Sequence, residues 1–359
     1  MYLNSIYLKG WRNYQEEKVT FNPGINLFLG NNGQGKTNLL EGIYFLATGQ
    51  SPRTSRIEDL INWHSQYFYL KGELHKDDGS NTIEMGGARD GRRVNKIDGV
   101  PLQRLTEIAG LLSAVFFMPE DLTLVKGGPA ARRRFLDTEI GQISRVYRFN
   151  VNNYKKYLRE RNALLKSKKP DKILLQVLTE KLADLSGPII QERNDYLQKL
   201  SLLTRLKHRK ISGNTEELSL RYNWSIEPGL SRQQVLAKFA ETRLLERQYK
   251  LTMVGPHKDD FSFVLNGAEL KAFGSQGQQR TAVLAVKLAE IELIKTETSE
   301  YPLLLLDDVF SELDEERREL LLEYLTDRVQ TFISSAEALP PGSKVNSYWV
   351  DAGRICERI

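Results

Sequence analysis

The residues best suited to chemistry form the run Gly-Asn-Asn-Gly-Gln-Gly-Lys-Thr at positions 30–37, which matches GxxxxGKS/T at every fixed position. In such a loop the glycines let successive backbone N–H groups turn toward phosphate oxygens. The Lys36 ammonium would reach the β- and γ-phosphates, and the Thr37 hydroxyl would ligate Mg²⁺. The sequence therefore predicts binding of ATP or GTP, with Lys36 also catalytic. The predicted nucleotide ligands are Gly30, Asn31, Asn32, Gly33, Gln34, Gly35, Lys36 and Thr37.

A second candidate site lies far along the chain, where four consecutive leucines end in Asp307 and Asp308. A continuous aliphatic run is typical of a strand buried on both faces, and ligands bind at the carboxyl ends of such strands in doubly wound sheets. We expect Asp307 to hold Mg²⁺ together with Thr37. We expect Asp308 to be catalytic, by polarising the attacking water or accepting its proton. The alternative is a buried strand that ends in a solvated acidic turn.

The segment Phe-Gly-Ser-Gln-Gly-Gln-Gln-Arg at positions 273–280 stands about thirty residues before the acidic strand and opens a predicted helix. Ser275 is an N-cap residue type, and glycine lets a ligand approach the backbone closely. The segment resembles the signature motif of ABC ATPases, and residues 311–314 resemble their D-loop. The resemblance implies that ATP joins two copies of the chain, with Ser275, Gly277 and Gln278 touching the nucleotide held by the partner and Ser275 also catalytic. The alternative is simply a capped helix.

The elements that must position these residues alternate between strand and helix at both ends of the chain. Strand 25–29 and helix 38–47 flank the phosphate loop, whereas the middle of the chain reads as long helices with breaks near 168–170 and 186–188. We expect an α/β, ABC-type P-loop ATPase domain with a mixed sheet, split by an inserted helical lobe. The expected divisions are 1–128 for the first half, 129–250 for the lobe and 251–359 for the second half.

Composition narrows the class of protein. The 359 residues are 40% hydrophobic and 27% charged, which is ordinary for a globular protein. No apolar run is long enough to span a membrane, and no signal peptide is evident. The single cysteine, Cys356, agrees with a reducing cytoplasm, so we expect a cytoplasmic protein without a membrane partner. Four histidines leave little for zinc, which favours oxygen-bound Mg²⁺ beside the nucleotide.

Basic residues concentrate in the middle of the chain. Residues 141–172 hold ten lysines and arginines against two acids, within a net charge of +5. Such a cluster favours contact with DNA phosphates, although a solvated helical face is the usual fate of surface charge. The candidate DNA contacts are Arg132, Arg133, Lys155, Lys156 and Arg159.

Several further segments resemble the RecF family of bacterial recombination mediators. These segments are residues 8–14, residues 119–137, Gly-Pro-His-Lys-Asp-Asp at 255–260 and Leu-Leu-Asp-Asp-Val-Phe-Ser-Glu-Leu-Asp at 305–314. The family resembles the head of SMC-type proteins without their long coiled coil, and Arg12 and Asn13 resemble head residues that approach the nucleotide. A surface position between two strands is the alternative for both.

The RecF-like segments imply a function. They imply an ATP-dependent homodimer that clamps duplex, gapped or junction DNA and binds RecR and RecO. Such a protein helps to load RecA at gaps and supports DNA replication, recombinational repair and the SOS response. The competing classes are the ATPase subunit of a transporter and a nuclease-linked ATPase. The large basic insertion disfavours the transporter, and only about fifty residues follow Asp308, too few for a nuclease domain.

The chain departs from the wider ABC pattern at four positions. Gln276 replaces a signature glycine, Asp308 replaces the commoner glutamate, and Ser334 stands where a switch histidine is usual. Glu120 is only a stand-in for the usual Q-loop glutamine. We expect slow hydrolysis and the use of ATP mainly as a switch.

Overall fold

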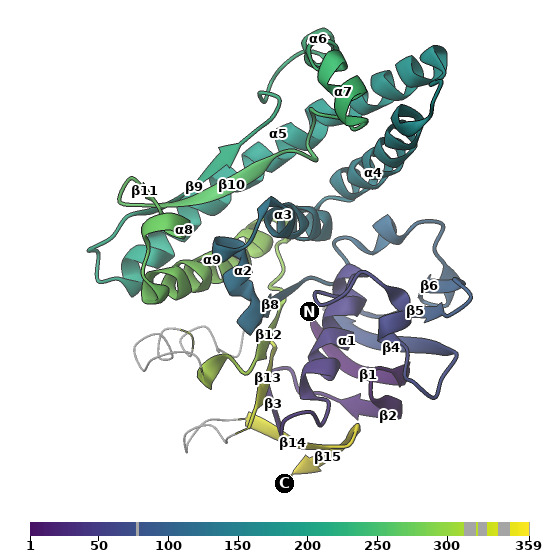
Figure 1. Ribbon diagram of the computed structural model, residues 1–359. Helices are drawn as coiled ribbons and strands as arrows, with labels where there is room; N and C mark the ends of the chain where they lie inside the picture. Colours follow the sequence, from purple (N-terminus) through teal and green to yellow (C-terminus); the bar gives the residue numbers. More distant parts are fainter. Residues whose placement is uncertain (77–78, 312–320, 322–328, 337–344, 359) are drawn as a thin grey trace. The chain divides into compact units, whose positions relative to one another are not determined.

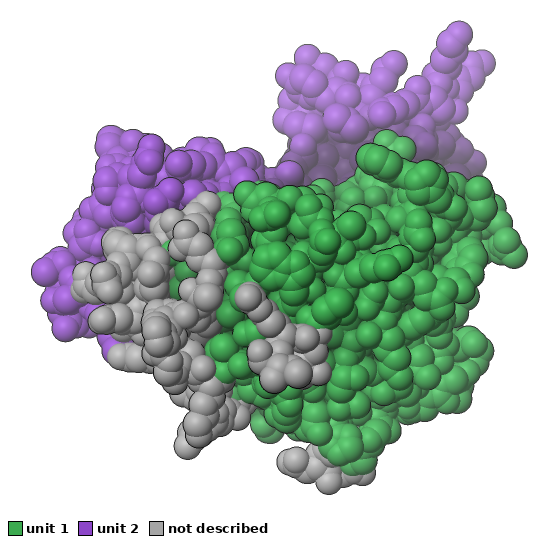
Figure 2. Space-filling model, turned by 90° about the horizontal axis from the view of Figure 1, so that it is seen from below, with its two compact units in different colours: residues 1–121, 290–359 green, residues 122–289 purple. Residues whose placement is uncertain are grey.

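The computed structural model describes residues 1–76, 79–311, 321, 329–336 and 345–358. The chain forms two compact units (Figures 1 and 2). Unit 1 combines residues 1–121 with 290–359, and unit 2 holds residues 122–289. Unit 1 is therefore assembled from both ends of the chain. The expected D-loop at 311–314 and the expected helix at 313–327 lie almost wholly outside the described residues.

Unit 1 contains a six-stranded antiparallel sheet in the order β2-β1-β4-β5-β6-β7. Its strands are β1 (Tyr2–Trp11), β2 (Tyr14–Thr20), β4 (Tyr67–Lys76), β5 (Gly79–Ala88), β6 (Arg93–Ile97) and β7 (Val100–Pro101). Short 3-10 turns in the same unit are η1 (Ile57–Leu60), η2 (Leu105–Ile108) and η4 (Val309–Ser311), and η3 (Pro119–Leu122) ends at the first residue of unit 2. Alternate residues of β1 are buried, which is the pattern of a sheet with one face on the core.

The second sheet of unit 1 carries the predicted site and has the order β15-β14-β3-β13-β12-β8. Its strands are β3 (Ile25–Leu29), β8 (Ala114–Phe117), β12 (Leu303–Asp307), β13 (Thr331–Ser335), β14 (Val345–Asp351) and β15 (Arg354–Arg358). All neighbours pair in parallel except β14 and β15, which form an antiparallel hairpin. The expected mixed sheet is therefore confirmed, and β12 is buried along its whole length.

Helix α1 (Lys36–Thr48) contacts strands of both sheets, and its apolar residues join the core between them (Figure 1). The helix is buried nearly all round, which explains why its apolar residues do not keep to one face. It ends at Gly49, whose φ of 68° gives the left-handed C-cap that favours glycine. The helix that follows the phosphate loop is therefore held on two sides, so its N-terminus is fixed.

Unit 2 is mainly helical, with a small antiparallel sheet in the order β11-β10-β9. Its strands are β9 (Leu218–Asn223), β10 (Asp260–Leu265) and β11 (Ala268–Glu269). Its helices are α2 (Thr123–Lys126), α3 (Pro129–Ile143), α4 (Arg145–Lys166), α5 (Lys172–Ile211), α6 (Arg232–Glu241), α7 (Arg243–Tyr249), α8 (Leu270–Phe273) and α9 (Gln276–Thr298), which continues into unit 1. Helices α4 and α5 form the expected hairpin (Figure 1). Among the described residues, no helix is long and apolar enough to cross a membrane.

Three expectations for unit 2 differ from the structure. Helix α5 runs through Pro188 without the expected break. Pro188 leaves the carbonyl of Asp184 without its helical donor, and Asp184 is exposed, so water can take that place. The helix expected from 231 to 249 divides into α6 and α7 at Thr242. Residues 251–289, assigned from sequence to the second ATPase half, group with unit 2, because β10 pairs with β9.

The RecF-like segments of unit 2 meet in a buried ionic network. The Arg193 guanidinium donates to Asp137 (2.8 Å), to Asp259 (3.3 Å) and to the carbonyl of Pro256 (2.6 Å). Tyr222 donates to the same Asp259 carboxylate. Arg193 and Asp259 are buried, so each charge depends on the other for compensation. The Gly-Pro-His-Lys-Asp-Asp run therefore organises the interior of unit 2.

His257 belongs to the same run and is held between two neighbours. Its Nε2 lies 3.0 Å from the carbonyl oxygen of Thr252, and its Nδ1 lies 2.7 Å from the hydroxyl of Tyr154. Because a carbonyl only accepts, Nε2 carries the proton and Nδ1 accepts from the tyrosine. Burial lowers the pKa of His257 to about 4. The neutral imidazole is thus the form that fits this position, where it links Thr252 to Tyr154.

We predict that His257 makes the stability of the protein depend on pH. Between its usual pKa of 6.5 and its folded pKa of about 4, the unfolded chain binds more protons than the folded one. The free energy of unfolding therefore falls as the pH drops through this window, by on the order of 2–3 kcal/mol from this group. His257→Gln keeps a neutral donor, so urea unfolding of this variant should show a flatter dependence on pH. An unchanged slope would mean that other groups cause the dependence.

Candidate nucleotide-binding site

The phosphate loop joins β3 to α1. Its glycines adopt the positive φ angles that such a loop requires. Gly30, Gly33 and Gly35 all have positive φ, at 149°, 80° and 121°. A Cβ at Gly30 would collide with the carbonyl oxygen of Val350, and one at Gly35 would lie 2.6 Å from Asn13 Nδ2. Another residue type would therefore strain the backbone at all three glycines, and its Cβ would also collide with neighbouring atoms at Gly30 and Gly35. Glycine at these positions fixes the curvature that brings N–H groups around an anion.

Lys36 spans the hollow of this loop. Its Nζ donates to the carbonyls of Gly30 (2.6 Å) and Asn31 (3.0 Å), and the residue is buried. Burial lowers the pKa of the ammonium, and the carboxylates of Asp308 and Asp307 oppose that effect. The Lys36 ammonium is therefore fixed at the loop, and the carboxylates of Asp307 and Asp308 are its counter-charges. In a complex with nucleotide, phosphate oxygens would replace the two backbone carbonyls as its hydrogen-bond acceptors.

Thr37 meets Asp307 at the end of β12, across 270 residues of sequence. Thr37 Oγ1 donates to Asp307 Oδ1 at 2.8 Å, and Ser334 Oγ donates to the same oxygen at 2.5 Å. Strand pairing causes the second contact, because Asp307 lies opposite Ser334 in the parallel β12–β13 pair. Burial raises the pKa of Asp307, while these two hydrogen bonds act to lower it.

A cavity of about 350 Å³ opens between the phosphate loop and the strand ends. Its lining residues are Asn32, Gly33, Gly35, Lys36, Thr37, Asn38, Arg53, Asp307, Asp308 and Ser334. A hydroxyl and a carboxylate that face one cavity are the oxygen ligands that Mg²⁺ prefers. Thr37 and Asp307 thus fit the ion that the sequence implied.

Asp308 follows the buried strand with a left-handed backbone, at φ 51°. Its N–H donates to the carbonyl oxygen of Ser334 at 3.2 Å and to Ser334 Oγ at 3.1 Å. A non-glycine residue in this region carries strain, and such strain concentrates at functional sites. The side chain is exposed and lines the cavity. Glu120 lies close enough to Asp307 to act electrostatically on its pKa.

A larger cavity of about 870 Å³ adjoins the phosphate site and shares Asn38 and Arg53 with it. Its other lining residues are Arg12, Asn13, Gln15, Glu16, Asp59, Ile61, Asn62, Trp63, His64, Asp351, Ala352, Gly353 and Arg354. Trp63 is 91% exposed, so its ring is available to stack on a planar ligand. The two cavities together offer space for a nucleoside beside its phosphates.

Arg12 and Asn13 are fixed by the elements of this site. Arg12 forms a two-pronged pair with the buried Glu41 of α1, at 2.8 and 2.7 Å. Asn13 Nδ2 donates to the carbonyl of Gln34, and Asn13 Oδ1 accepts from Asn38. Both residues therefore support the phosphate loop. Arg53 lies in no motif, so its place in the site was not predicted from sequence. Ser334 was singled out in the sequence only because it stands where a switch histidine is usual.

The signature-like segment belongs to unit 2 and begins α9. The N–H of Gln278 donates to Ser275 Oγ (3.2 Å), and the N–H of Ser275 donates to Gln278 Oε1 (2.8 Å). This reciprocal capping box confirms Ser275 as the N-cap. Gln278 Nε2 also donates to Glu216 at 2.7 Å, so this side chain helps to hold the start of the helix. Its contact with nucleotide stays a prediction. Ser275 is exposed, and Gly277 is half-buried.

The candidate DNA contacts divide into two groups. Arg132 is buried and forms a two-pronged pair with Asp260 (2.7 and 2.9 Å), and Arg133 donates to the carbonyl of Asp259. These two arginines hold α3 to the start of β10, so the expectation that Arg132 is exposed to phosphate is wrong. Lys155, Lys156 and Arg159 are exposed on α4. Lys155 also pairs with Asp137 at 2.7 Å.

Comparison with known proteins gives one consistent answer. The RecF/RecN/SMC N terminal domain family matches residues 2–339. The chain is 44% identical over 345 residues to the DNA replication and repair protein RecF of Geobacillus thermodenitrificans, covering 93% of this chain and 92% of that protein. It is 43% identical to the protein of the same name from Limosilactobacillus fermentum, with the same coverage.

Solved structures agree with these sequence matches. The structure of the recombination mediator protein RecF with ATP, from the RecFOR pathway, matches with a TM-score of 0.93 at 36% identity. That match covers 100% of this chain and 98% of the other. The Smc head domain of Pyrococcus furiosus matches with a TM-score of 0.55 at 17% identity, which shows a shared fold. The chain has the fold of an SMC-head-like ABC ATPase, and it belongs to the RecF family.

Proposed function

We propose that this chain is an ATP-binding DNA replication and repair protein that uses ATP to close a homodimer on DNA. The contact between Thr37 and Asp307 carries the proposal, because it joins the phosphate loop to the acidic strand from opposite ends of the chain. A relative that matches all of this chain has been solved with ATP. The RecF-like segments add RecR and RecO as partners and a cytoplasmic location, with loading of RecA as the downstream step.

The residues of the site would have separate roles in binding and hydrolysing ATP. The loop N–H groups and Lys36 hold the phosphates, and Thr37 and Asp307 hold Mg²⁺. An Mg²⁺ ion held by Thr37 and Asp307 would supply positive charge to offset the charge that develops on the phosphate oxygens. Asp308 orients the attacking water from the cavity wall. Aspartate is one methylene shorter than the usual glutamate, and Ser334 is shorter than histidine, so we propose weak hydrolysis that resets the dimer.

The test of the proposed function is the size of the protein in solution. Sedimentation velocity should show a monomer in buffer or with ADP and a dimer with Mg-ATP, because each nucleotide would bridge Lys36 of one copy and Ser275 of the other. Adding a duplex with a single-stranded gap should increase the dimer fraction. A monomer under all of these conditions would contradict the dimer switch and leave only nucleotide binding.

The exposed face of α4 is the proposed DNA contact. Lys155, Lys156 and Arg159 lie there, with Arg145 and Lys166 also exposed on the helix and Glu160 the one exposed acid among its described residues. Phosphate contacts of this kind position a protein without reading sequence. We therefore propose sequence-independent binding to duplex or gapped DNA.

We predict that this face sets the salt dependence of DNA binding. The logarithm of the affinity should fall by about 0.9 per decade of salt for each duplex phosphate neutralised. The triple replacement of Lys155, Lys156 and Arg159 by alanine should flatten this slope and leave ATP binding unchanged. Fluorescence anisotropy with a labelled duplex at several salt concentrations measures the slope.

The matched control removes three positive charges elsewhere in unit 2. Arg232 is exposed and pairs with Asp184, Lys238 is half-buried and pairs with Glu241, and Arg247 is exposed on α7. Alanine at these three positions should leave the slope close to that of the parent protein. Equal slopes in both triple variants would assign the α4 face to another role.

A further inference from the structure

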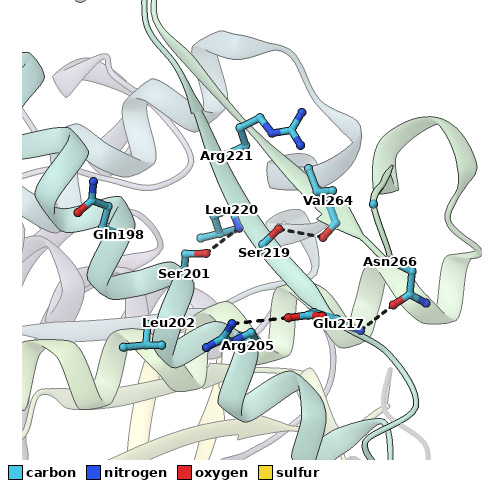
Figure 3. Close-up of a pocket in the computed structure, with 11 residues that line it drawn as sticks. Gln198, Ser201, Leu202, Arg205, Glu217, Ser219, Leu220, Arg221, Val264 and Asn266 are labelled. Carbon is cyan, nitrogen blue, oxygen red and sulfur yellow. Dashed lines mark hydrogen bonds and ion pairs between the residues drawn. The ribbon is translucent and has the colours of Figure 1, made fainter. Parts of the chain in front are cut away.

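A groove on unit 2 lies outside the nucleotide site. It has a volume of about 560 Å³ and runs between the C-terminal half of α5 and strands β9 and β10 (Figure 3). Its lining residues are Gln198, Ser201, Leu202, Arg205, Glu217, Ser219, Leu220, Arg221, Val264, Asn266 and Gly267. Volumes of about 300–1,000 Å³ are typical of pockets that hold ligands.

Hydrogen bonds fix the walls of this groove. Ser201 of α5 accepts a hydrogen bond from the N–H of Leu220, at 2.9 Å, which ties the helix to the outer edge of β9 (Figure 3). The side chain of Asn266 accepts from the N–H of Glu217 at 2.8 Å, which fixes the end of the strand. The groove is therefore built from two anchored elements and does not depend on a loop.

The groove carries more positive than negative charge. Arg205 and Arg209 both lie 3.6 Å from the Glu217 carboxylate, so one acid serves two arginines. Arg221 is exposed in the lining and forms no ion pair with any residue that the structure describes. Carboxylates are the complementary groups for such guanidinium donors. A ligand that carries carboxylates would complete the charge balance of this surface.

The exposed face of α5 changes from polar to apolar where the helix borders the groove. From Lys181 to Gln198 the exposed positions of α5 are mostly polar, at residues 181, 184, 188, 191, 195 and 198. One turn later the same face becomes apolar, with Leu202 52% and Leu206 54% exposed. Leu202 lines the groove, and Leu206 lies one turn beyond it on the same helix. Exposed leucines beside arginines are typical of a protein-binding surface.

Nucleic acid fits this groove less well than a peptide. The lining contains no aromatic ring for base stacking. Exposed leucines add nothing to phosphate binding, whereas they pack well against apolar side chains. We propose that the α5–β9 groove binds an extended acidic peptide of a protein partner, whose carboxylates meet Arg205 and Arg221 and whose apolar side chains cover Leu202 and Leu206.

Peptide binding in this groove would not require the nucleotide switch. The test selects peptides from a displayed library of random twelve-residue sequences on the full-length protein. The enriched peptide is then synthesised with a fluorescein label, and its binding is measured by fluorescence anisotropy. We expect enrichment of aspartate or glutamate together with leucine, isoleucine or phenylalanine. Enriched peptides without acidic residues would overturn the proposal.

Paired variants locate the binding site of the labelled peptide. Arg205→Ala with Arg221→Ala should weaken binding about tenfold or more, and Leu202→Asp with Leu206→Asp should do the same. The controls are Arg232→Ala and Leu244→Asp, which change an exposed arginine and a leucine that is 79% exposed elsewhere in unit 2. The controls should bind like the parent, and all variants should keep its thermal unfolding midpoint. Equal affinity in the groove variants would overturn the proposal.

Two further measurements separate other occupants. A labelled duplex whose binding is lost in the arginine variant but kept in the leucine variant would assign the groove to nucleic acid. Loss of the ATP-dependent dimer in the leucine variant, with no selected peptide bound by the parent, would assign it to a second copy of this chain. Either result would replace the peptide proposal.

Discussion

Asp308→Asn is expected to lower the rate of ATP hydrolysis about 10²–10⁴-fold while the protein still binds Mg-ATP. The physical reason is that Asp308 is exposed to the cavity, whereas Asp307 and Thr37 form the oxygen pair that would hold the ion. Asparagine is among the residues most often found at positive φ, so the backbone at 51° is preserved and only the charge is lost. Single-turnover hydrolysis measures the rate, and a fluorescent ATP analogue measures binding.

The matched control for this variant is Asp307→Asn. It removes one charge from the neighbouring residue, but the expected result differs, because the Mg²⁺-dependent part of nucleotide affinity should be lost. Asp308→Asn should also remain dimeric after ATP is added, since the reset step is slowed. Hydrolysis at the parent rate in Asp308→Asn would remove this carboxylate from the mechanism.

Ser275→Arg is expected to abolish the ATP-induced dimer without loss of ATP binding. Ser275 is exposed at the start of α9, and its hydroxyl caps that helix. In the proposed dimer this helix start faces the nucleotide held by the other copy, so a long cation would keep the two surfaces apart. The phosphate loop belongs to unit 1 and is unchanged by the replacement. Sedimentation with Mg-ATP measures the dimer.

The replacement also removes a helix cap, which alone costs about 0.5–2 kcal/mol of stability. Ser275→Ala loses the same cap without added bulk, and it is the control. We expect the alanine variant to form a weaker dimer and the arginine variant to form none. If Ser275→Arg dimerises with ATP as the parent does, the nucleotide does not bridge two copies through this residue.

The parts of the site that depend on local backbone could be predicted from the amino-acid sequence. A phosphate loop needs positive φ at fixed spacing and a helix behind it, so Gly30, Gly33 and Gly35 before α1 could be identified without a structure. The N-cap at Ser275 follows from a serine three residues before a glutamine, which is also local. The buried strand β12 was predictable because four consecutive leucines fit only a site covered on both faces.

Which polar side chains face the site, and which pair elsewhere, could not be predicted before the folded chain was seen. Arg132 and Arg159 both lie in basic runs, yet Arg132 is buried against Asp260 and Arg159 is exposed. Ser334 reaches Asp307 because strands distant in sequence pair in parallel, and nothing in its own neighbourhood signals that contact. The neighbouring residues in the sequence do not specify which group a charged side chain or a hydroxyl will pair with. A buried polar group must have a hydrogen-bond or ionic partner, and that partner is determined only when the chain folds.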